Sequence, residues 1–118
     1  MTRIRITLAS GKQIAATLGN NPAARDFSAL LPLTLTLNDY HKIEKVSDLP
    51  TPLNTQGEPE GYDPDVGDIT YYAPWGNLAI FYQDFGYASG LVKLGKIEAG
   101  IESLHPKDPI VATIEKAH

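Results

Sequence analysis

The 118-residue sequence predicts a mainly β domain that folds as a closed barrel or a sandwich. Seven or eight short segments have strand composition, whereas only two short stretches have helical spacing. A second observation locates the centre of the fold. Seven of the ten aromatic residues, and the only tryptophan, lie between Gly67 and Gly90. We therefore expect the core or pocket to be built from this stretch.

The amino-terminal segments predict an opening β-hairpin. Arg3–Ala9 alternates apolar and polar residues, which is the period of a half-buried strand. Ser10 and Gly11 form a turn, and Gln13–Leu18 returns with the same alternation. The segment begins basic but does not continue into the apolar core of a signal peptide, so we expect a cytoplasmic protein.

The first helix is predicted over Pro22–Leu31. Asn21 can cap its free amide groups, and proline suits the first helical position because its missing N–H is not needed there. Phe27, Leu30 and Leu31 follow a spacing of i, i+3 and i+4, which forms one apolar stripe. This stripe is expected to face the core.

The middle of the chain predicts a strand followed by a long loop. Leu33–Leu37 alternates leucine with threonine and is the clearest strand, and Tyr40–Val46 is expected to continue it more weakly. Ser47–Val66 contains four prolines and several acids, a composition that does not suit a buried strand. Long loops in small domains are often functional, so we expect a flap near the pocket.

The aromatic stretch predicts a second hairpin. Asp68–Ala73 and Asn77–Gln83 flank Pro74-Trp75-Gly76, in which proline and glycine suit successive turn positions. Leu78–Tyr82 in the second arm is apolar on both faces. A strand of this kind is covered on both faces, as in a barrel wall under a helix or loop.

The carboxyl-terminal third predicts a strand, a short helix and a last strand. These are Leu91–Lys96, Glu98–Leu104 and Ile110–Glu115. Pairing of the last strand with the first would leave no sheet edge exposed. We expect residues 1–118 to form a single domain.

Composition removes several classes of function. The formal net charge is −4 and the ten lysines and arginines are spread thinly, so nucleic acid is not an expected partner. No apolar run approaches the length of about 18–20 residues that spans a bilayer, so no membrane partner is expected. The chain has no cysteine, and its three histidines are not spaced as a metal set. We predict no metal, no cofactor and no catalytic residue.

Two motifs are better explained by structure than by chemistry. Gly90–Lys96 has the letters of a phosphate-binding loop, but Ile97 stands where serine or threonine should follow, and the segment is strand-like. Asp63, Asp65 and Asp68 cluster, yet their spacing is not that of a calcium-binding loop. We interpret the first motif as a strand and the second as a solvated acidic turn.

The segment Leu94–Leu104 resembles the Gly-Lys-Val-x-x-Gly-Met-Asp-x-Val segment of cyclophilins. Gly67-Asp68, Tyr71–Gly76 and Phe81-Tyr82 resemble, more closely, the small bacterial and archaeal cyclophilin-like proteins of unassigned activity. The resemblance implies a closed eight-stranded β-barrel capped by two short helices, with a binding face on its outer wall.

The sequence departs from the cyclophilins that isomerise prolyl bonds. Those enzymes place an arginine on the third strand and a histidine four residues before the glycine of Gly-Lys-Val. Here Leu33–Asn38 has no arginine, and Leu91 occupies the histidine position. Only Phe81 or Tyr82 matches an aromatic residue of that pocket. A binding protein is therefore favoured over an isomerase.

We predict that a small molecule or short peptide binds in an aromatic groove without covalent chemistry. Trp75 is the leading contact residue because a barrel interior does not need a tryptophan on a turn, and Asp84 would supply a polar anchor. The predicted ligand-binding residues are Tyr72, Trp75, Phe81, Tyr82, Asp84 and Phe85. Two alternatives remain: a prolyl isomerase of low activity, and a module that docks to a protein partner through the same rings.

Overall fold

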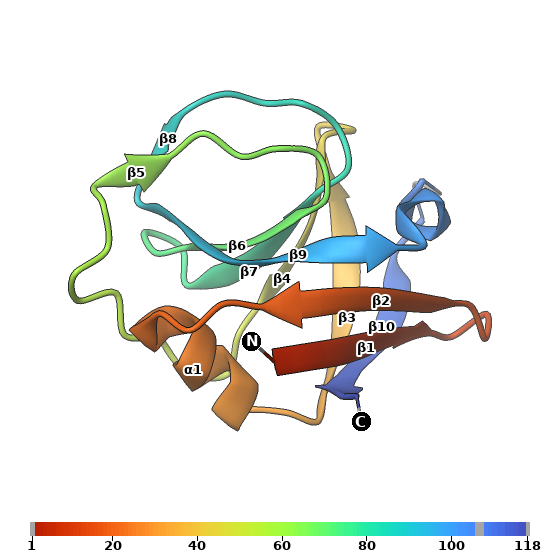
Figure 1. Ribbon diagram of the computed structural model, residues 1–118. Helices are drawn as coiled ribbons and strands as arrows, with labels where there is room; N and C mark the ends of the chain where they lie inside the picture. Colours follow the sequence, from red (N-terminus) through yellow and green to blue (C-terminus); the bar gives the residue numbers. More distant parts are fainter. Residues whose placement is uncertain (1, 106–107, 118) are drawn as a thin grey trace.

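The computed structural model describes residues 2–105 and 108–117 and contains a closed eight-stranded antiparallel barrel (Figure 1). The strands follow one another around the barrel in the order β1-β10-β3-β4-β7-β6-β9-β2. Their bounds are β1 Thr2–Leu8, β2 Gln13–Leu18, β3 Leu33–Tyr40, β4 Glu44–Asp48, β6 Asp68–Tyr72, β7 Asn77–Phe81, β9 Leu91–Ala99 and β10 Ile110–Lys116. The barrel alternative is therefore confirmed over the sandwich.

The first and last strands pair and close the barrel, as expected from the need to leave no sheet edge exposed. Their register runs from Ile4 opposite Lys116 to Leu8 opposite Ala112. Ile4, Ile6 and Leu8 point inward and are buried, while the residues between them are more exposed. Apolar burial on one face of each strand is the main source of stability for this layer.

The predicted continuation of the third strand through Tyr40–Val46 is wrong. The chain reverses at His41 and Lys42, which have positive φ angles of 54° and 58°, and returns as β4. The Lys42 N–H donates to Asp39 Oδ2 at 3.1 Å, which stabilises this left-handed turn without a glycine. β3 and β4 therefore form a hairpin.

The helices differ from the prediction in three respects: the end of the first helix, its cap, and the second helix. Helix α1 spans Pro22–Ala29, and the Asn21 side chain makes no capping hydrogen bond. In place of the second helix, β9 continues through Ala99, and a single 3₁₀ turn, η1 (Ile101–Leu104), follows Gly100 at φ 95°. No helix in the described part of the chain combines the length and apolar character required to cross a bilayer.

The proline-rich segment after β4 is attached to the barrel. Leu53 is buried, and its N–H donates to the Tyr71 hydroxyl at 3.3 Å. The N–H of Asn54 donates to Asp26 Oδ2 on α1 at 2.8 Å. Further along, the two-residue strand β5 (Gly61–Tyr62) pairs with β8 (Ala88–Ser89) as a separate two-stranded sheet outside the barrel (Figure 1).

Strand β7 is buried on both faces, as its sequence predicts. Leu78 and Ile80 belong to the barrel core. Ala79 and Phe81 point the other way and pack with Leu91 in a separate outer cluster. The outer wall at β7 is therefore covered, and the cover creates the site described next.

Candidate functional site

A cavity of about 190 Å³ lies on the outer wall of the barrel, between the strands and the segment that follows β7. We call it the outer-wall cavity. It is lined by Tyr40, Glu44, Tyr72, Trp75, Asn77, Phe81, Phe85, Ala88 and Leu91. Phe85 and Ala88 come from the covering segment, and the other seven residues come from the wall and its turns.

Strand register brings the wall residues together. Glu44 pairs with Tyr40 across β3 and β4, and with Phe81 across β4 and β7. Tyr72 likewise pairs with Asn77 on β7 and with Leu91 on β9. Residues opposite each other in a sheet point to the same face, so these side chains converge outside the barrel.

Four of the six predicted ligand-binding residues line this cavity: Tyr72, Trp75, Phe81 and Phe85. Trp75 is 58% exposed on the turn between β6 and β7, and Phe85 is 51% exposed. Phe81 is buried and stacks on Phe85, with ring centroids 5.7 Å apart. One wall of the cavity is therefore fixed, and its rim presents rings to solvent.

Tyr82 and Asp84 lie outside the lining. The Tyr82 hydroxyl donates a hydrogen bond to Asp39 Oδ1, and Lys45 Nζ lies 5.4 Å from the Tyr82 ring centroid. Burial and the bond to Asp39 raise the pKa of Tyr82 to about 12. Asp84 is exposed and accepts the N–H of Phe85 at 3.1 Å.

Lys45 is a fully buried cation that forms an ion pair with Asp39 at 3.2 Å. Burial alone favours the protonated form of Asp39, but hydrogen bonds from Tyr82 and Lys45 outweigh it and lower the pKa of that carboxyl. The Tyr82 side chain therefore belongs to a polar network beside the cavity.

Five lining residues were not among the predicted ligand-binding residues: Tyr40, Glu44, Asn77, Ala88 and Leu91. Glu44 is the only charged residue among the described residues that line the cavity. Burial raises the pKa of its carboxyl to about 7. The wrong assignment of Tyr40–Val46 to the preceding strand concealed the position of Glu44, because it gave no hairpin that would pair Glu44 with Tyr40.

Asn77 presents an unpartnered acceptor. Its side chain is only 5% exposed, and its Oδ1 has no hydrogen-bond partner among the described residues. Most buried polar atoms in proteins are hydrogen-bonded, and an unpaired one is costly. Asn77 lines the cavity, so a hydrogen-bond donor in the cavity would satisfy this oxygen.

Three rings form what we call the aromatic corner. Trp75 lies edge-on to Tyr72, with ring centroids 5.2 Å apart and planes at 82°. It lies edge-on to Tyr40 as well, at 5.9 Å and 84°. Both spacings are within the range of favourable aromatic pairs. The indole is therefore held in place although much of its surface is exposed.

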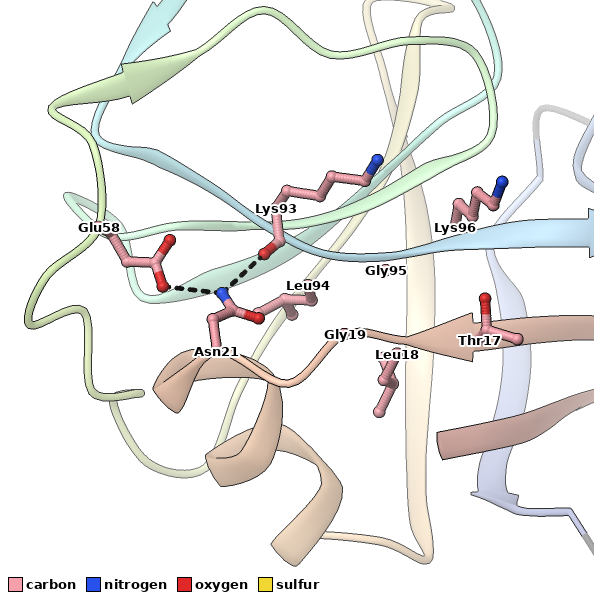
Figure 2. A pocket seen from close by; sticks show the side chains of 9 residues that line it. All are labelled: Thr17, Leu18, Gly19, Asn21, Glu58, Lys93, Leu94, Gly95 and Lys96. Atoms are coloured by element: carbon pink, nitrogen blue, oxygen red, sulfur yellow. Dashed lines mark hydrogen bonds between the residues drawn. The ribbon is translucent and has the colours of Figure 1, made fainter. Parts of the chain in front are cut away.

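A second, larger cavity of about 380 Å³ lies between the start of α1 and β9 (Figure 2). Asn21 Nδ2 donates to Glu58 Oε2 at 2.8 Å and to the Lys93 carbonyl oxygen at 3.1 Å. Thr17 Oγ1 donates to Glu98 Oε1 at 3.0 Å. These hydrogen bonds connect the start of α1, β2, β9 and the proline-rich segment.

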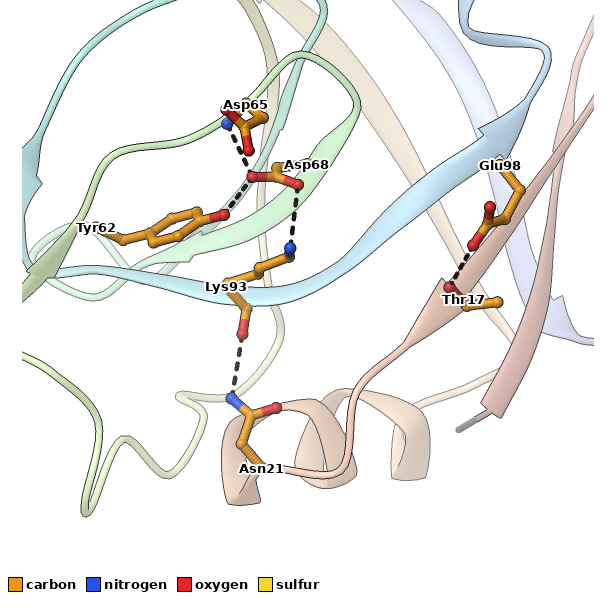
Figure 3. Close-up of polar contacts among 7 residues, drawn as sticks. All are labelled: Thr17, Asn21, Tyr62, Asp65, Asp68, Lys93 and Glu98. Carbon is orange, nitrogen blue, oxygen red and sulfur yellow. Dashed lines mark hydrogen bonds and ion pairs between the residues drawn. The ribbon is translucent and has the colours of Figure 1, made fainter.

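The same face carries a polar cluster around Asp68 (Figure 3). Asp68 Oδ2 accepts the Tyr62 hydroxyl at 2.6 Å and the Asp65 N–H at 2.8 Å, while Lys93 Nζ lies 3.5 Å from Asp68 Oδ1. Two causes raise the pKa of Tyr62 above its usual value: burial, which is the larger, and the hydrogen bond to Asp68.

The interpretation of this segment as a solvated acidic turn is wrong for Asp68. This residue is only 3% exposed, and the bonds that it accepts stabilise its buried carboxylate. Asp63 and Asp65 are exposed. No group of three or more metal-ligating side chains occurs in residues 2–105 and 108–117. The nearby Gly90–Lys96 motif forms the start of β9, so its interpretation as a strand is confirmed.

Comparison with known proteins agrees with this architecture. The model of the cyclophilin-like family matches residues 7–115. The solution structure of the hypothetical protein AF2241 from Archaeoglobus fulgidus is similar, with a TM-score of 0.70 at 20% sequence identity. That match covers 98% of this chain and 95% of the archaeal chain. No curated protein matches. The chain belongs to the cyclophilin-like family.

Proposed function

We propose that this protein binds a small molecule, or one side chain of a short peptide, in the outer-wall cavity without covalent chemistry. The observation that carries the proposal is the convergence of Tyr72, Trp75 and Phe85 on one cavity outside the barrel. Concave sites lined by rings, with few polar groups, are typical of ligand binding. The exposed rings Trp75 and Phe85 at its rim support the same conclusion.

The size of the cavity limits the ligand. Its volume is about 190 Å³. A buried cavity of about 150 Å³ is enough for benzene, and pockets for drug-sized ligands begin at about 300 Å³. The cavity therefore suits one ring or a compact branched group, and a larger ligand would leave its remainder in solvent.

The lining favours binding over catalysis. Among the described residues of the wall there is one carboxyl group, Glu44, and no hydroxyl nucleophile other than phenols. Leu91 lines the cavity at the position that the resemblance assigns to a histidine in prolyl isomerases. An apolar side chain there shapes the cavity but does not polarise a substrate.

Tryptophan fluorescence tests the proposal, since Trp75 is the only tryptophan and lines the cavity. A panel of small ring compounds and short proline-containing peptides should contain members that change its emission saturably. Phe85→Ala should weaken this response because it removes the covering ring, whereas Tyr87→Ala should preserve it, as Tyr87 is exposed outside the lining.

A panel that never changes the emission would contradict the proposal. Two other outcomes would favour the alternatives. A concentration-dependent mass that Trp75→Ala abolishes would favour a protein-docking module. Acceleration of prolyl isomerisation that Phe81→Ala abolishes would favour an enzyme.

A further inference from the structure

We propose that the outer-wall cavity selects an organic ammonium ion, which the aromatic corner surrounds while Glu44 balances its charge. This inference rests on the proposed function and names its ligand class. Three independent features of the cavity carry it: the ring geometry, the single acidic side chain and the unpartnered oxygen of Asn77.

The ring geometry is that of a partial aromatic cage. Trp75 stands nearly perpendicular to both Tyr72 and Tyr40, at 82° and 84°, with centroid distances below 6 Å. All three rings line the same cavity, and tryptophan is the most effective ring for binding a cation. Cages of this kind recognise alkylated ammonium groups.

The charge of the cavity has one sign. Glu44 supplies the only charged side chain among its described lining residues. No hydrogen bond or ion pair to the Glu44 carboxyl is found within the described ranges. Its neighbour Lys45 pairs with Asp39. Glu44 is therefore available to a ligand cation, and a charge of this kind in a partly dry site acts more strongly than in water.

Asn77 adds a directional contact. Its buried Oδ1 lacks a donor among the described residues, and the residue lies in the same wall as Glu44. An N–H or O–H carried beside the cation would satisfy it. The cavity thus offers a cage for the cation, a carboxylate for its charge and an acceptor for one hydrogen-bond donor.

The protonation of Glu44 gives the site a pH dependence. Burial raises the pKa of this carboxyl to about 7. The other titratable groups of the lining are the phenols of Tyr40 on β3 and Tyr72 on β6, while β7, β9 and the covering segment contribute uncharged residues. Cation binding requires the carboxylate, so affinity should rise between about pH 6 and about pH 8.

Choline and its neutral carbon isostere, 3,3-dimethylbutanol, test the inference. They have nearly the same shape, are close to benzene in size and carry the same hydroxyl, so they differ in charge alone. Calorimetric titration of the full chain should give choline an affinity about tenfold higher at pH 8, and the preference should shrink at pH 5.5.

Glu44→Gln should remove most of this preference, and Glu98→Gln serves as the matched control. Glu98 is an exposed acid on β9 that bonds Thr17 outside the cavity, so its variant should keep the preference. The comparison of the two compounds on the unaltered protein gives a result even where a variant fails to fold.

The outcomes separate this inference from the proposed function. Equal or tighter binding of 3,3-dimethylbutanol, or preference for the anionic isostere 3,3-dimethylbutanoate, overturns the ammonium inference and leaves ligand binding intact. The anionic preference would arise if the Asn77 amide had the opposite orientation, with its N–H₂ group and not its oxygen directed to the ligand. If neither choline nor any member of the ring and peptide panel binds, both proposals are overturned.

Discussion

Trp75 contacts Tyr72 edge to face across the turn between β6 and β7, with ring centroids 5.2 Å apart and planes at 82°. The turn itself is closed by the Gly76 N–H, which donates to the Tyr72 carbonyl oxygen at 2.9 Å, and Gly76 has a φ of 65°. The same four-residue reversal therefore shapes the backbone and fixes the indole over the outer-wall cavity.

Trp75→Ala should reduce ligand binding with little loss of stability. The indole is 58% exposed, so its removal should change the free energy of unfolding by less than about 1 kcal/mol. Affinity should fall about tenfold or more, because one wall of the cavity is lost. Denaturant unfolding and calorimetric titration measure the two effects. Trp75→Phe is the control and should retain part of the affinity. An alanine variant that binds as tightly as the unaltered protein would contradict the assignment of Trp75 to the ligand site.

Glu44→Gln should stabilise the fold at neutral and higher pH. The folded-state pKa of about 7 lies above the value of about 4.3 for an unfolded glutamate, so the folded chain binds the extra proton in this window. Stability of the unaltered protein should therefore fall as pH rises from about 4.5 to about 7. Allowing for partial solvent screening, we expect a difference of roughly 1 kcal/mol.

Denaturant midpoints measured across this pH range test the Glu44 prediction. The unaltered protein should show the downward slope, and the glutamine variant should lack this part of it. A variant with the same pH dependence as the unaltered protein would show that the Glu44 carboxyl is fully hydrated.

Gly95→Ala should disrupt the pairing of β2 with β9. A Cβ at this position would lie 2.0 Å from the Thr17 carbonyl oxygen, which belongs to the paired strand backbone and cannot move aside easily. We expect a loss of about 3 kcal/mol or failure to fold. Gly86→Ala is the matched control, since a Cβ there meets nothing within 4 Å. Thermal unfolding that is alike for the two variants would refute the prediction.

Tyr82→Phe should weaken the fold without changing affinity. Its hydroxyl donates to Asp39, which also pairs with the buried Lys45. Removing it should cost about 1–2 kcal/mol of unfolding free energy. The ring lies outside the cavity lining, so choline and the ring compounds should bind as before. A large loss of affinity with unchanged stability would contradict this prediction and show that Tyr82 contacts the ligand.

The barrel could be predicted because its determinants are local or compositional. Alternation in Arg3–Ala9 and Ile110–Glu115 marks two half-buried strands, and the pairing of first and last strands follows from the need to protect edges. The apolar run in β7 likewise predicts a wall covered on both faces. Each of these signals depends on side-chain period, which a sequence displays directly.

The site was less predictable because it depends on register and on a turn without the usual residues. His41 and Lys42 reverse the chain in left-handed conformations that glycine or asparagine normally marks, so the start of β4 was missed and Glu44 with it. Phe81 and Tyr82 are adjacent in sequence, yet the first lines the cavity and the second joins Lys45 and Asp39. Only the three-dimensional pairing separates these roles.

The indole N–H signal of Trp75 in a ¹H–¹⁵N spectrum provides the most direct test, because this chain has a single tryptophan. We predict that titration with choline shifts this signal saturably and shifts the Asn77 side-chain amide with it, while the Gly95 amide in the second cavity stays in place. Shifts confined to Gly95 and its neighbours, or a Trp75 signal that no ring compound, peptide or ammonium ion moves, would contradict a ligand site on the outer wall.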